Sequence, residues 1–388
     1  MQSNIHPVPD EPTEARPASR KRWLLYALAV LLVMVLLVWI LLANTTVLDG
    51  LKRAFRYLGS DGDYGSIRFE SYGTSTYALL DTDFAVATQG GVTLFSESGD
   101  ALGRIQRSFA NPALKANGDR LLIYDIGGTL FAQMNRSGDL LIDETAAGRI
   151  YDADLSSKGY SALLYAGEGS HACLDIYHPT GTLLYRRSSN THYLSCCAVA
   201  PDGAYAVAAA LGQKDAAFTA ALQIFRTDSE TEITELSLGN RMVYDLAFVN
   251  TNTFCAIAED GLYFYRTDGT ALGEYSFDGG ALTGYSFGGS GFVALTLDLY
   301  DAGSRHCLTV LNGSGEATAT VSLDEAPIHV SAHGSYVSVL TAQTLSVYNR
   351  ELHRSSALTT AGGYTNAFVR DDGTAVLVSA GAAELYIP

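Results

Sequence analysis

The 388-residue chain is short of basic residues and of tryptophan. Its 25 lysines and arginines stand against 41 aspartates and glutamates, which gives a formal net charge of −16 at pH 7. Contacts of Lys and Arg to phosphate supply most of the affinity of nucleic-acid-binding proteins, so this balance argues against a nucleic-acid partner. The two tryptophans, Trp23 and Trp39, both lie in one apolar run near the N-terminus. The rest of the chain is an acidic body without tryptophan.

Cysteine is scarce as well, and no CxxC pair occurs. An odd number of cysteines excludes a framework in which all are paired within the chain. We expect them to be small buried hydrophobes, because free cysteine is among the most buried residue types. A bridge that involves Cys173 or Cys307 is the alternative. The cysteines are Cys173, Cys196, Cys197, Cys255 and Cys307.

Motifs for catalysis and cofactor binding are missing too. No GxSxG string, P-loop or dinucleotide fingerprint occurs, so we predict no catalytic residue and no cofactor. His329 and His333 are four residues apart, but they fall on a predicted strand and its turn, where they cannot form the ligand pair that a helix would present. We expect both histidines to be exposed, and we predict no metal site.

One long apolar run is present, at residues 23–43. It carries no charge, and at about 1.5 Å per residue it is long enough to cross a hydrocarbon core of about 30 Å. We predict a transmembrane signal anchor, with a cleaved signal peptide as the alternative. The basic residues 20–22 flank its start, which predicts that residues 1–22 are cytoplasmic and that the body lies outside the cell. Residues 1–22 contain four prolines and no evident domain, so we predict a disordered tail. A cytosolic body is the alternative.

Residues 44–63 follow the apolar run. Apolar side chains recur there at helical spacing, from Val47 to Leu58, before a Ser-Asp-Gly-Asp break that begins at Ser60. We predict an amphipathic juxtamembrane stalk and linker, which either lies on the lipid headgroups or continues the membrane helix. From there to the C-terminus, residues 64–388, short runs of β-forming residues alternate with Gly, Asp and Asn turns, which predicts one β domain.

Two hairpin signatures recur along this domain. One is strand, tight turn, strand, as in VAPDGAYAVAAA from Val199; the other is an apolar strand that ends in a large residue before a polar turn, as in LYFYRTDGTALGEYSF from Leu262. The second signature gives eight repeats, 37 to 48 residues apart, near the period of about 40 to 45 of a four-stranded propeller blade. We predict an all-β, eight-bladed β-propeller preceded by one transmembrane α-helix, with seven blades as the alternative. The aligned large residues are Phe95, Met134, Tyr177, Phe225, Tyr265, Leu311, Tyr348 and Tyr386.

The eighth repeat has only three strands before the sequence reaches Pro388. A spare strand, SIRFESY, lies ahead of the first complete blade at Ser66 to Tyr72. We predict that this strand supplies the missing outer position of the eighth blade. Both ends of the domain would then close the ring and leave no exposed sheet edge.

The hairpin PDGAYAVA at residues 201–208 resembles the bacterial WD40-like propeller repeat, although the GH and WD dipeptides of standard WD40 repeats do not occur. The whole layout resembles a clostridial (Firmicutes) family of single-pass membrane-anchored, WD40-like or quinoprotein-like β-propellers of unknown function. Quinone-dependent propeller dehydrogenases lock their blades with tryptophans. The body has none, so the resemblance does not extend to a quinone cofactor.

Three connections between the second and third strands of a blade are longer than the rest: 167–172, 211–219 and 299–306. They should lie on the face opposite the tight turns. Loops that vary on a rigid scaffold commonly carry binding, so we predict a recognition surface there, with plain solvated loop residues as the alternative. The predicted surface consists of Glu168, His171, Lys214, Asp215, Tyr300, Asp301, Arg305 and His306.

These observations predict a protein-interaction or ligand-binding module of the cell envelope, held in the cell membrane by a single span, with an envelope protein or glycan as its partner. Two other classes stay open. One is an enzyme that processes envelope glycan or peptide in the central channel, where inner strands could offer paired carboxylates. The other is a sensor that signals through the cytoplasmic tail. A polar, carboxylate-lined channel would favour the enzyme, and a narrow, featureless one the binding module.

Overall fold

The structure is a computed structural model that describes residues 26, 28–35, 50, 52–54, 56–57, 66–71, 73–214, 217–229, 232–300 and 305–388, with the backbone alone at 214, 232 and 233. The chain divides into two compact units, Met1–Gly59 and Ser60–Pro388. The two units are described separately below.

The described part of the first unit is helical at residues 28–35 and 52–54. The helical segment 28–35 lies inside the predicted membrane span. No helix in the described part of the chain is both long and apolar enough to cross a membrane. The prediction of a transmembrane helix ahead of the propeller is therefore wrong. The predicted tail at 1–22, and the remaining residues of the predicted anchor and stalk, lie outside the described residues.

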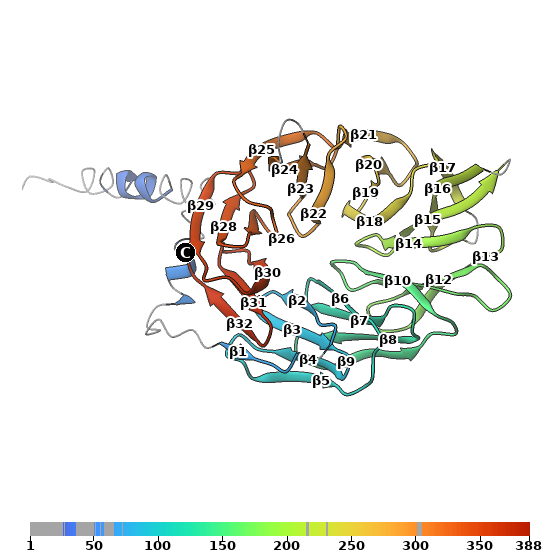
Figure 1. Ribbon diagram of the computed structural model, residues 1–388, viewed down its shortest axis with the longest axis horizontal. Coiled ribbons are helices and arrows are strands. Elements are labelled where there is room, and N and C mark those ends of the chain that lie inside the picture. Colours follow the sequence, from blue (N-terminus) through green and yellow to red (C-terminus); the bar gives the residue numbers. More distant parts are fainter. Residues whose placement is uncertain are drawn as a thin grey trace, which may run out of the picture. The chain divides into compact units, whose positions relative to one another are not determined.

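The second unit is an eight-bladed β-propeller, as predicted. Its strands form eight four-stranded antiparallel sheets, which are arranged as blades around a central axis (Figure 1). The first strands of most neighbouring blades contact one another, and Figure 1 shows the first strand of each blade nearest the axis. The seven-bladed alternative is excluded.

Blades 1 to 4 occupy residues 76–239. Their middle strands are almost continuous apolar runs, because each middle strand packs against a neighbouring blade on both of its faces. In order, the strands are β2 (Thr76–Leu80), β3 (Asp83–Thr88), β4 (Gly91–Phe95), β5 (Ala101–Ile105), β6 (Pro112–Asn117), β7 (Arg120–Asp125), β8 (Leu130–Asn135), β9 (Leu140–Thr145), β10 (Ile150–Leu155), β11 (Ser161–Tyr165), β12 (Ala172–Tyr177), β13 (Leu183–Ser189), β14 (Tyr193–Val199), β15 (Tyr205–Lys214), β16 (Ala217–Arg226) and β17 (Glu232–Gly239).

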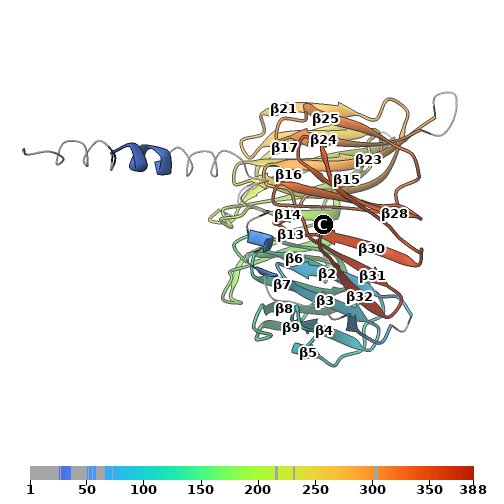
Figure 2. The ribbon, with the colours of Figure 1, turned by 90° about the vertical axis from the view of Figure 1, so that its left-hand side faces the viewer.

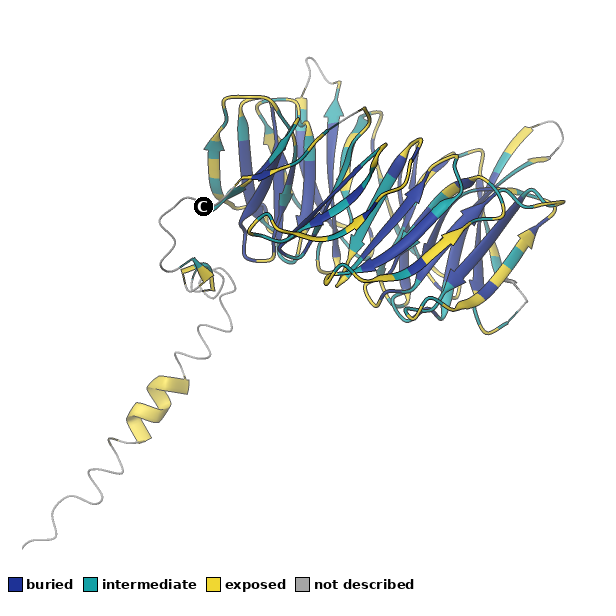
Figure 3. Ribbon diagram, turned by 90° about the horizontal axis from the view of Figure 1, so that it is seen from below, coloured by how far each residue is buried: buried dark blue, intermediate teal, exposed yellow. Residues whose placement is uncertain are grey.

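Blades 5 to 8 occupy residues 243–386 and are completed by one strand from the start of the domain. Their outer strands alternate between half-buried and exposed side chains, because one face of each looks to solvent (Figure 3). The strands are β18 (Val243–Asn250), β19 (Thr253–Ala258), β20 (Gly261–Arg266), β21 (Ala271–Ser276), β22 (Ala281–Ser286), β23 (Phe292–Leu299), β24 (Arg305–Asn312), β25 (Ala317–Leu323), β26 (His329–His333), β27 (Tyr336–Leu340), β28 (Thr344–Asn349), β29 (Arg354–Thr359), β30 (Tyr364–Val369), β31 (Ala375–Ser379), β32 (Ala382–Tyr386) and β1 (Ile67–Arg68).

The ring closes as the sequence predicted. Strand β1 is the outer strand of blade 8 and pairs with β32, Ile67 opposite Ala383 and Arg68 opposite Ala382. Figures 1 and 2 both show the C-terminal strands β31 and β32 beside the N-terminal strands of blade 1. Ile67 is buried in an apolar cluster that also contains Phe84 of blade 1, so the closing strand joins the two ends of the ring.

The large residues aligned in the sequence mark one recurring structural position, the C-terminal end of each blade's third strand. In blades 1 to 7 the pairing of the third and fourth strands shifts register at this residue, for example between Phe264 and Tyr265. A β-bulge at this point bends the outer strand into its turn. The predicted register of the repeats is confirmed.

The core lies between blades rather than at one centre. One apolar cluster, for example, joins Leu164 of blade 3 to Cys197 and Phe225 of blade 4. All five cysteines are buried and free, so the prediction of buried hydrophobes is confirmed and the bridge at Cys173 or Cys307 is excluded.

Candidate binding site at the channel mouth

The two faces of the propeller differ in their connections. We call the face formed by the connections between second and third strands, and between blades, the loop face, and the opposite one, formed by tight turns, the turn face. Thirteen large hydrophobic side chains of the described propeller are exposed, and eight of them lie on the loop face. Four of the others are leucines in the first two residues of outer strands, next to the tight turns at the rim, and one points into the channel. The eight are Ile126, Tyr151, Tyr193, Phe218, Met242, Tyr244, Tyr300 and Ile328.

Six of these side chains stand beside the starts of inner strands, where the channel opens onto the loop face. Tyr151, Tyr193 and Tyr244 are the first or second residues of β10, β14 and β18. Ile126 bridges to the start of β10 at Ile150, while the other two precede β18 and β26. We name this set the apolar arc, and it consists of Ile126, Tyr151, Tyr193, Met242, Tyr244 and Ile328.

Two members of the apolar arc sit at β-bulges with the same local sequence. Strands β10 and β18 begin Ile-Tyr-Asp and Val-Tyr-Asp, and in both the ladder to the second strand skips the tyrosine, Tyr151 or Tyr244. A bulge leaves its extra residue unpaired and re-aims the side chains beside it. We call these two places the Tyr-Asp bulges. Each leaves an exposed tyrosine at the mouth and places an aspartate, Asp152 or Asp245, inside the channel.

Polar side chains of inner strands also fasten each blade to the next. The Asp152 and Asp154 carboxylates of blade 3 accept hydrogen bonds from backbone N–H groups of blade 4, at 2.9 Å from Cys197 and 3.0 Å from Val199. Asn117 donates to a backbone carbonyl of blade 3, and Ser286 accepts from a backbone N–H of blade 7. Most polar groups of the channel wall therefore have a structural role.

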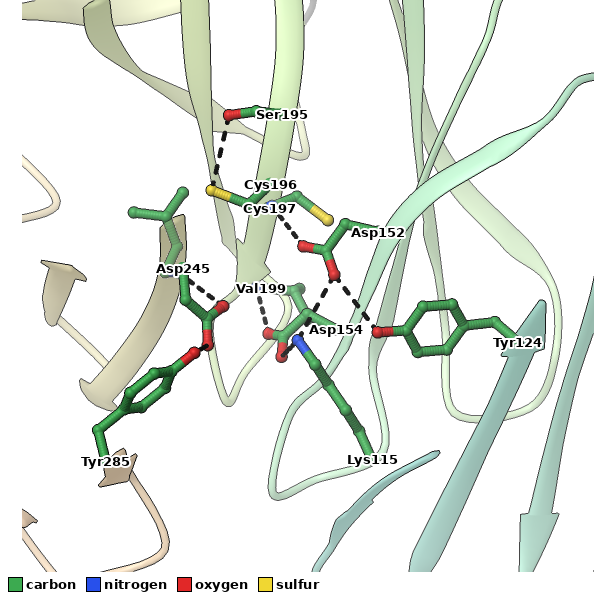
Figure 4. Close-up of polar contacts among 11 residues, drawn as sticks. Lys115, Tyr124, Asp152, Asp154, Ser195, Cys196, Cys197, Val199, Asp245 and Tyr285 are labelled. Carbon is green, nitrogen blue, oxygen red and sulfur yellow. Dashed lines mark hydrogen bonds and ion pairs between the residues drawn. The ribbon is translucent and has the colours of Figure 1, made fainter. Parts of the chain in front are cut away.

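A charged cluster forms where β6, β10 and β18 approach one another (Figure 4). The Lys115 ammonium of β6 lies 3.4 Å from Asp154 and 3.8 Å from Asp152. Burial lowers the pKa of Lys115, but the nearby carboxylates outweigh that effect and the net shift is upward. Burial also raises the pKa of Asp152 and of Asp154, and Lys115 only partly offsets it. The ammonium thus pairs with two carboxylates and interacts at longer range with a third, Asp245 of β18.

Asp245 of the second Tyr-Asp bulge is held differently. Its carboxylate accepts hydrogen bonds from the Tyr285 hydroxyl of blade 6 at 3.0 Å and from the backbone N–H of Leu246 at 2.9 Å. Among the described residues it forms no ion pair with a basic side chain. Burial and the Asp245 charge together raise the pKa of Tyr285, so this phenol stays a hydrogen-bond donor at neutral pH.

Two thiols lie beside the cluster. Burial raises the pKa of Cys196 and of Cys197, and the Asp152 carboxylate raises both further. Because the thiolate is the reactive form, neither group is prepared for nucleophilic attack. No group of three or more His, Cys, Asp or Glu side chains in the described residues has the arrangement of a metal site.

The predicted loop residues fall into three separate places. In blade 3, Glu168 is exposed and the His171 ring packs on Tyr193 with 4.4 Å between ring centroids, which joins His171 to the apolar arc. In blade 4 there is no loop at 211–219, because β15 and β16 pair as far as Lys214 and Ala217. Such pairing satisfies the backbone of residues that had been expected to form a loop. Asp215 and the side chain of Lys214 lie outside the described residues.

In blade 6 the predicted residues border a cavity of about 470 Å³ between blades 5 and 6. Tyr300 and Arg305 line it together with Cys307 and apolar side chains. The His306 imidazole forms a hydrogen bond with Asp298. Since successive side chains of a strand point to opposite faces, the His306 and Cys307 side chains do not contact one another. Asp301 lies outside the described residues.

The prediction that His329 and His333 are both exposed is half wrong. His333 is exposed, but His329 is half-buried and bonds through Nδ1 to the backbone of Ala367 at 3.0 Å. Burial lowers the pKa of His329, which keeps the imidazole neutral. It fastens blade 7 to blade 8 like the other polar groups of the inner strands.

Sequence reasoning missed the apolar arc and the charged cluster. Tyrosine in a strand pattern predicts burial, and nothing in a single strand shows that a bulge exposes it. The usable signal was the repetition of apolar-Tyr-Asp at the start of the inner strands of blades 3 and 5, at residues 150–152 and 243–245.

Solved structures share the fold. The C-terminal WD40 domain of Sif2 matches with a TM-score of 0.59 and 13% identity, over 84% of this chain and 97% of that one. BamB from Moraxella catarrhalis matches with 0.50 and 12%, over 83% and 98%, and a eukaryotic initiation factor with 0.53 and 11%, over 82% and 87%. At these identities the likeness shows the fold alone, and no curated protein matches the chain.

The predicted resemblance to WD40-like propellers is thereby confirmed as a likeness of fold, and the clostridial origin stays a prediction. One family profile matches the propeller nearly from end to end, over residues 64–381. The chain belongs to that family, the family of unknown function DUF5711.

Proposed function

We propose that this propeller is a protein-interaction module that binds its partner on the loop face, across the channel mouth. The observation that carries the proposal is the distribution of exposed apolar side chains: eight lie on the loop face, six of them around the channel mouth, whereas those next to the tight turns are four leucines at the rim. Contiguous exposed apolar surface bordered by polar groups is typical of protein-binding sites. Tyrosines make good anchors, because they bury a large area at a small loss of side-chain entropy.

The site also suits a partner segment rather than a flat protein surface. The apolar arc rims a channel whose wall is polar, so a segment that covers the arc can send one side chain inward to the charged cluster. His171, one of the residues predicted from sequence, extends the arc through its contact with Tyr193. The cell-envelope location and the envelope protein or glycan partner stay predictions.

A selection experiment tests the module. The purified propeller is used to select binders from a displayed library of random peptides, and the affinity of a synthetic selected peptide is then measured. Replacing Tyr151, Tyr193 and Tyr244 by Ser should weaken binding at least tenfold, because three anchors are lost. The matched control replaces three equally exposed leucines of outer strands, Leu140, Leu183 and Leu184, and should change binding less than twofold. Equal losses in both variants, or no selectable binder, would contradict the proposal.

A second candidate function is hydrolysis in the channel, and one observation favours it. Asp152 and Asp154 stand two residues apart with raised pKa values, so the channel is polar and carboxylate-lined. The same two carboxylates are already bound to Lys115 and to backbone N–H groups, which makes the binding module the better supported function. Release of nitrophenol from a panel of nitrophenyl glycosides, lost in Asp152→Asn, would favour the enzyme instead.

A further inference from the structure

We propose that the loop face selects a partner segment with a lysine or arginine side chain, and that the cation enters the channel to pair with Asp245. The inference rests on the proposed function and names the chemistry of the partner. The apolar arc provides the interaction surface, and the negative charge of the channel mouth favours a partner with a positive charge.

The protein itself shows how a cation sits at a Tyr-Asp bulge. At the bulge of blade 3, the preceding blade extends Lys115 from β6, and its ammonium lies within 3.8 Å of Asp152 and 3.4 Å of Asp154. The arrangement is therefore an ammonium pocket that the chain fills from within. Exposed Tyr151 stands at its entrance.

The bulge of blade 5 has the same construction, but its aspartate has no ion pair in the described residues and interacts with Lys115 only at longer range. The blade that precedes it is blade 4, whose inner strand β14 has the sequence YLSCCAV and so contains no lysine or arginine. Toward blade 5 that strand presents Cys196 and Ala198, which pack in the apolar cluster with Leu246. The carboxylate of Asp245 is left with a hydroxyl and an amide donor, and it remains half-buried in the channel.

Charge favours a cation over a neutral or acidic group at this place. The cluster contains three carboxylates and one ammonium, in a chain whose formal net charge is −16. Attraction to an incoming cation is stronger at a partly desolvated carboxylate than at a surface one. Tyr285 lies next to the carboxylate (Figure 4), and aromatic rings attract cations as well. An extended segment can cover the apolar arc while one long basic side chain reaches Asp245.

The test uses the full chain and defined peptide pools. Fluorescein-labelled hexapeptide amides are made with Lys, Arg or Gln fixed at the third position and a mixture of uncharged residues at the others. We expect the Lys and Arg pools to bind at least tenfold more tightly than the Gln pool in fluorescence anisotropy. Binding of the cationic pools should weaken as salt rises from 50 to 500 mM, and binding of the Gln pool should change little.

Variants then locate the cation. Asp245→Asn keeps the size of the side chain and an acceptor for Tyr285, and it should reduce the preference for Lys and Arg to below threefold. Asp245→Glu should retain the preference. The matched control Glu259→Gln removes the same charge from an exposed residue on the loop face of the same blade, and the preference should persist. Thermal unfolding of each variant confirms that it is folded.

Each remaining outcome overturns the inference in a recognisable way. If the Gln pool binds as tightly as the cationic pools, the peptide-binding module stands and the cation site falls. The same holds if Asp245→Asn leaves the preference intact or if Glu259→Gln abolishes it. If no pool binds while the library selection succeeds, the inference alone falls; if neither experiment yields a binder, the proposed function falls with it.

Discussion

The two Tyr-Asp bulges are built alike and differ in what completes them. In blade 3, Asp152 forms an ion pair with a lysine from the preceding blade and accepts a hydrogen bond from the Cys197 backbone N–H of the next. In blade 5, Asp245 is bound by a tyrosine hydroxyl of the next blade, and the preceding strand offers no lysine or arginine. Asp152 therefore holds two blades together, whereas Asp245 is the carboxylate of the channel wall that we propose binds a ligand.

This difference teaches that repetition of a motif does not mean repetition of its role. The same backbone position recurs in each of the eight inner strands. Its side chain can hold two blades together in one blade and be available to bind a ligand in another. What decides is the residue contributed by the neighbouring blade: Lys115 in one case, Cys196 and Ala198 in the other. Variants of these residues separate the two roles.

The largest effect should come from Lys115→Met. It leaves Asp152 and Asp154, whose side chains are 15% exposed, without their cation. Removing one partner of a buried ion pair leaves uncompensated charge, and for these partly exposed groups we expect a loss of about 2 to 3 kcal/mol in the free energy of unfolding. Urea unfolding measures it. The control Lys158→Met removes an exposed lysine from the first turn of blade 3 and should change stability by less than about 0.5 kcal/mol.

The loss in Lys115→Met should also depend on pH. The pKa values of Asp152 and Asp154 are raised in the folded protein, and without the ammonium they should rise further. A carboxyl group with a raised folded pKa binds its proton more readily folded than unfolded, so it favours the folded state increasingly as pH falls through that pKa. The stability gap between Lys115→Met and the unmodified protein should therefore be widest near pH 7 and narrow toward pH 4.5. A gap independent of pH would mean that Lys115 stabilises by packing alone.

An effect of intermediate size on the free energy of unfolding should distinguish Asp152 from Asp245. Asp152→Asn removes the charge that binds both Lys115 and the Cys197 N–H, and we expect a loss of about 1 to 2 kcal/mol. Asp245→Asn should stay within about 0.5 kcal/mol, since the amide oxygen still accepts from Tyr285 and one negative charge leaves an acidic cluster. Urea unfolding of both variants at pH 7 gives the comparison. Equal losses would show that Asp245 is as structural as Asp152.

Much of the fold followed from the sequence, because a repeat with a period near one blade constrains architecture strongly. The aligned residues from Phe95 to Tyr386 gave the blade count and the register of the outer turns. The spare strand and the incomplete last repeat gave the closure between β1 and β32. Composition alone predicted the transmembrane helix, and that prediction is wrong for the described residues.

The site was predictable only in part. Glu168, His171 and Tyr300 lie on the face opposite the tight turns, as predicted, and their part in binding stays a prediction. The apolar arc was not predicted, because exposure of Tyr151 and Tyr244 depends on bulges that form between strands of one blade. Lys115 and Asp154 are 39 residues apart and meet only after two blades pack. Contacts of this kind have no local sequence signature.

The smallest effect should come from the two tyrosine hydroxyls. Tyr285→Phe removes a hydrogen bond of 3.0 Å to Asp245, with an expected loss of about 0.5 to 1 kcal/mol, whereas Tyr124→Phe removes a longer bond of 3.4 Å to Asp152 and should cost less than about 0.5 kcal/mol. The reason is that Asp152 keeps its lysine and its amide donor, while Asp245 loses one of its two donors. Double-mutant cycles with the Asn variants measure each coupling directly. A larger coupling energy for Tyr124 with Asp152 than for Tyr285 with Asp245 would contradict this prediction. It would mean that the tyrosine hydroxyl matters more to the bulge of blade 3 than to the bulge of blade 5.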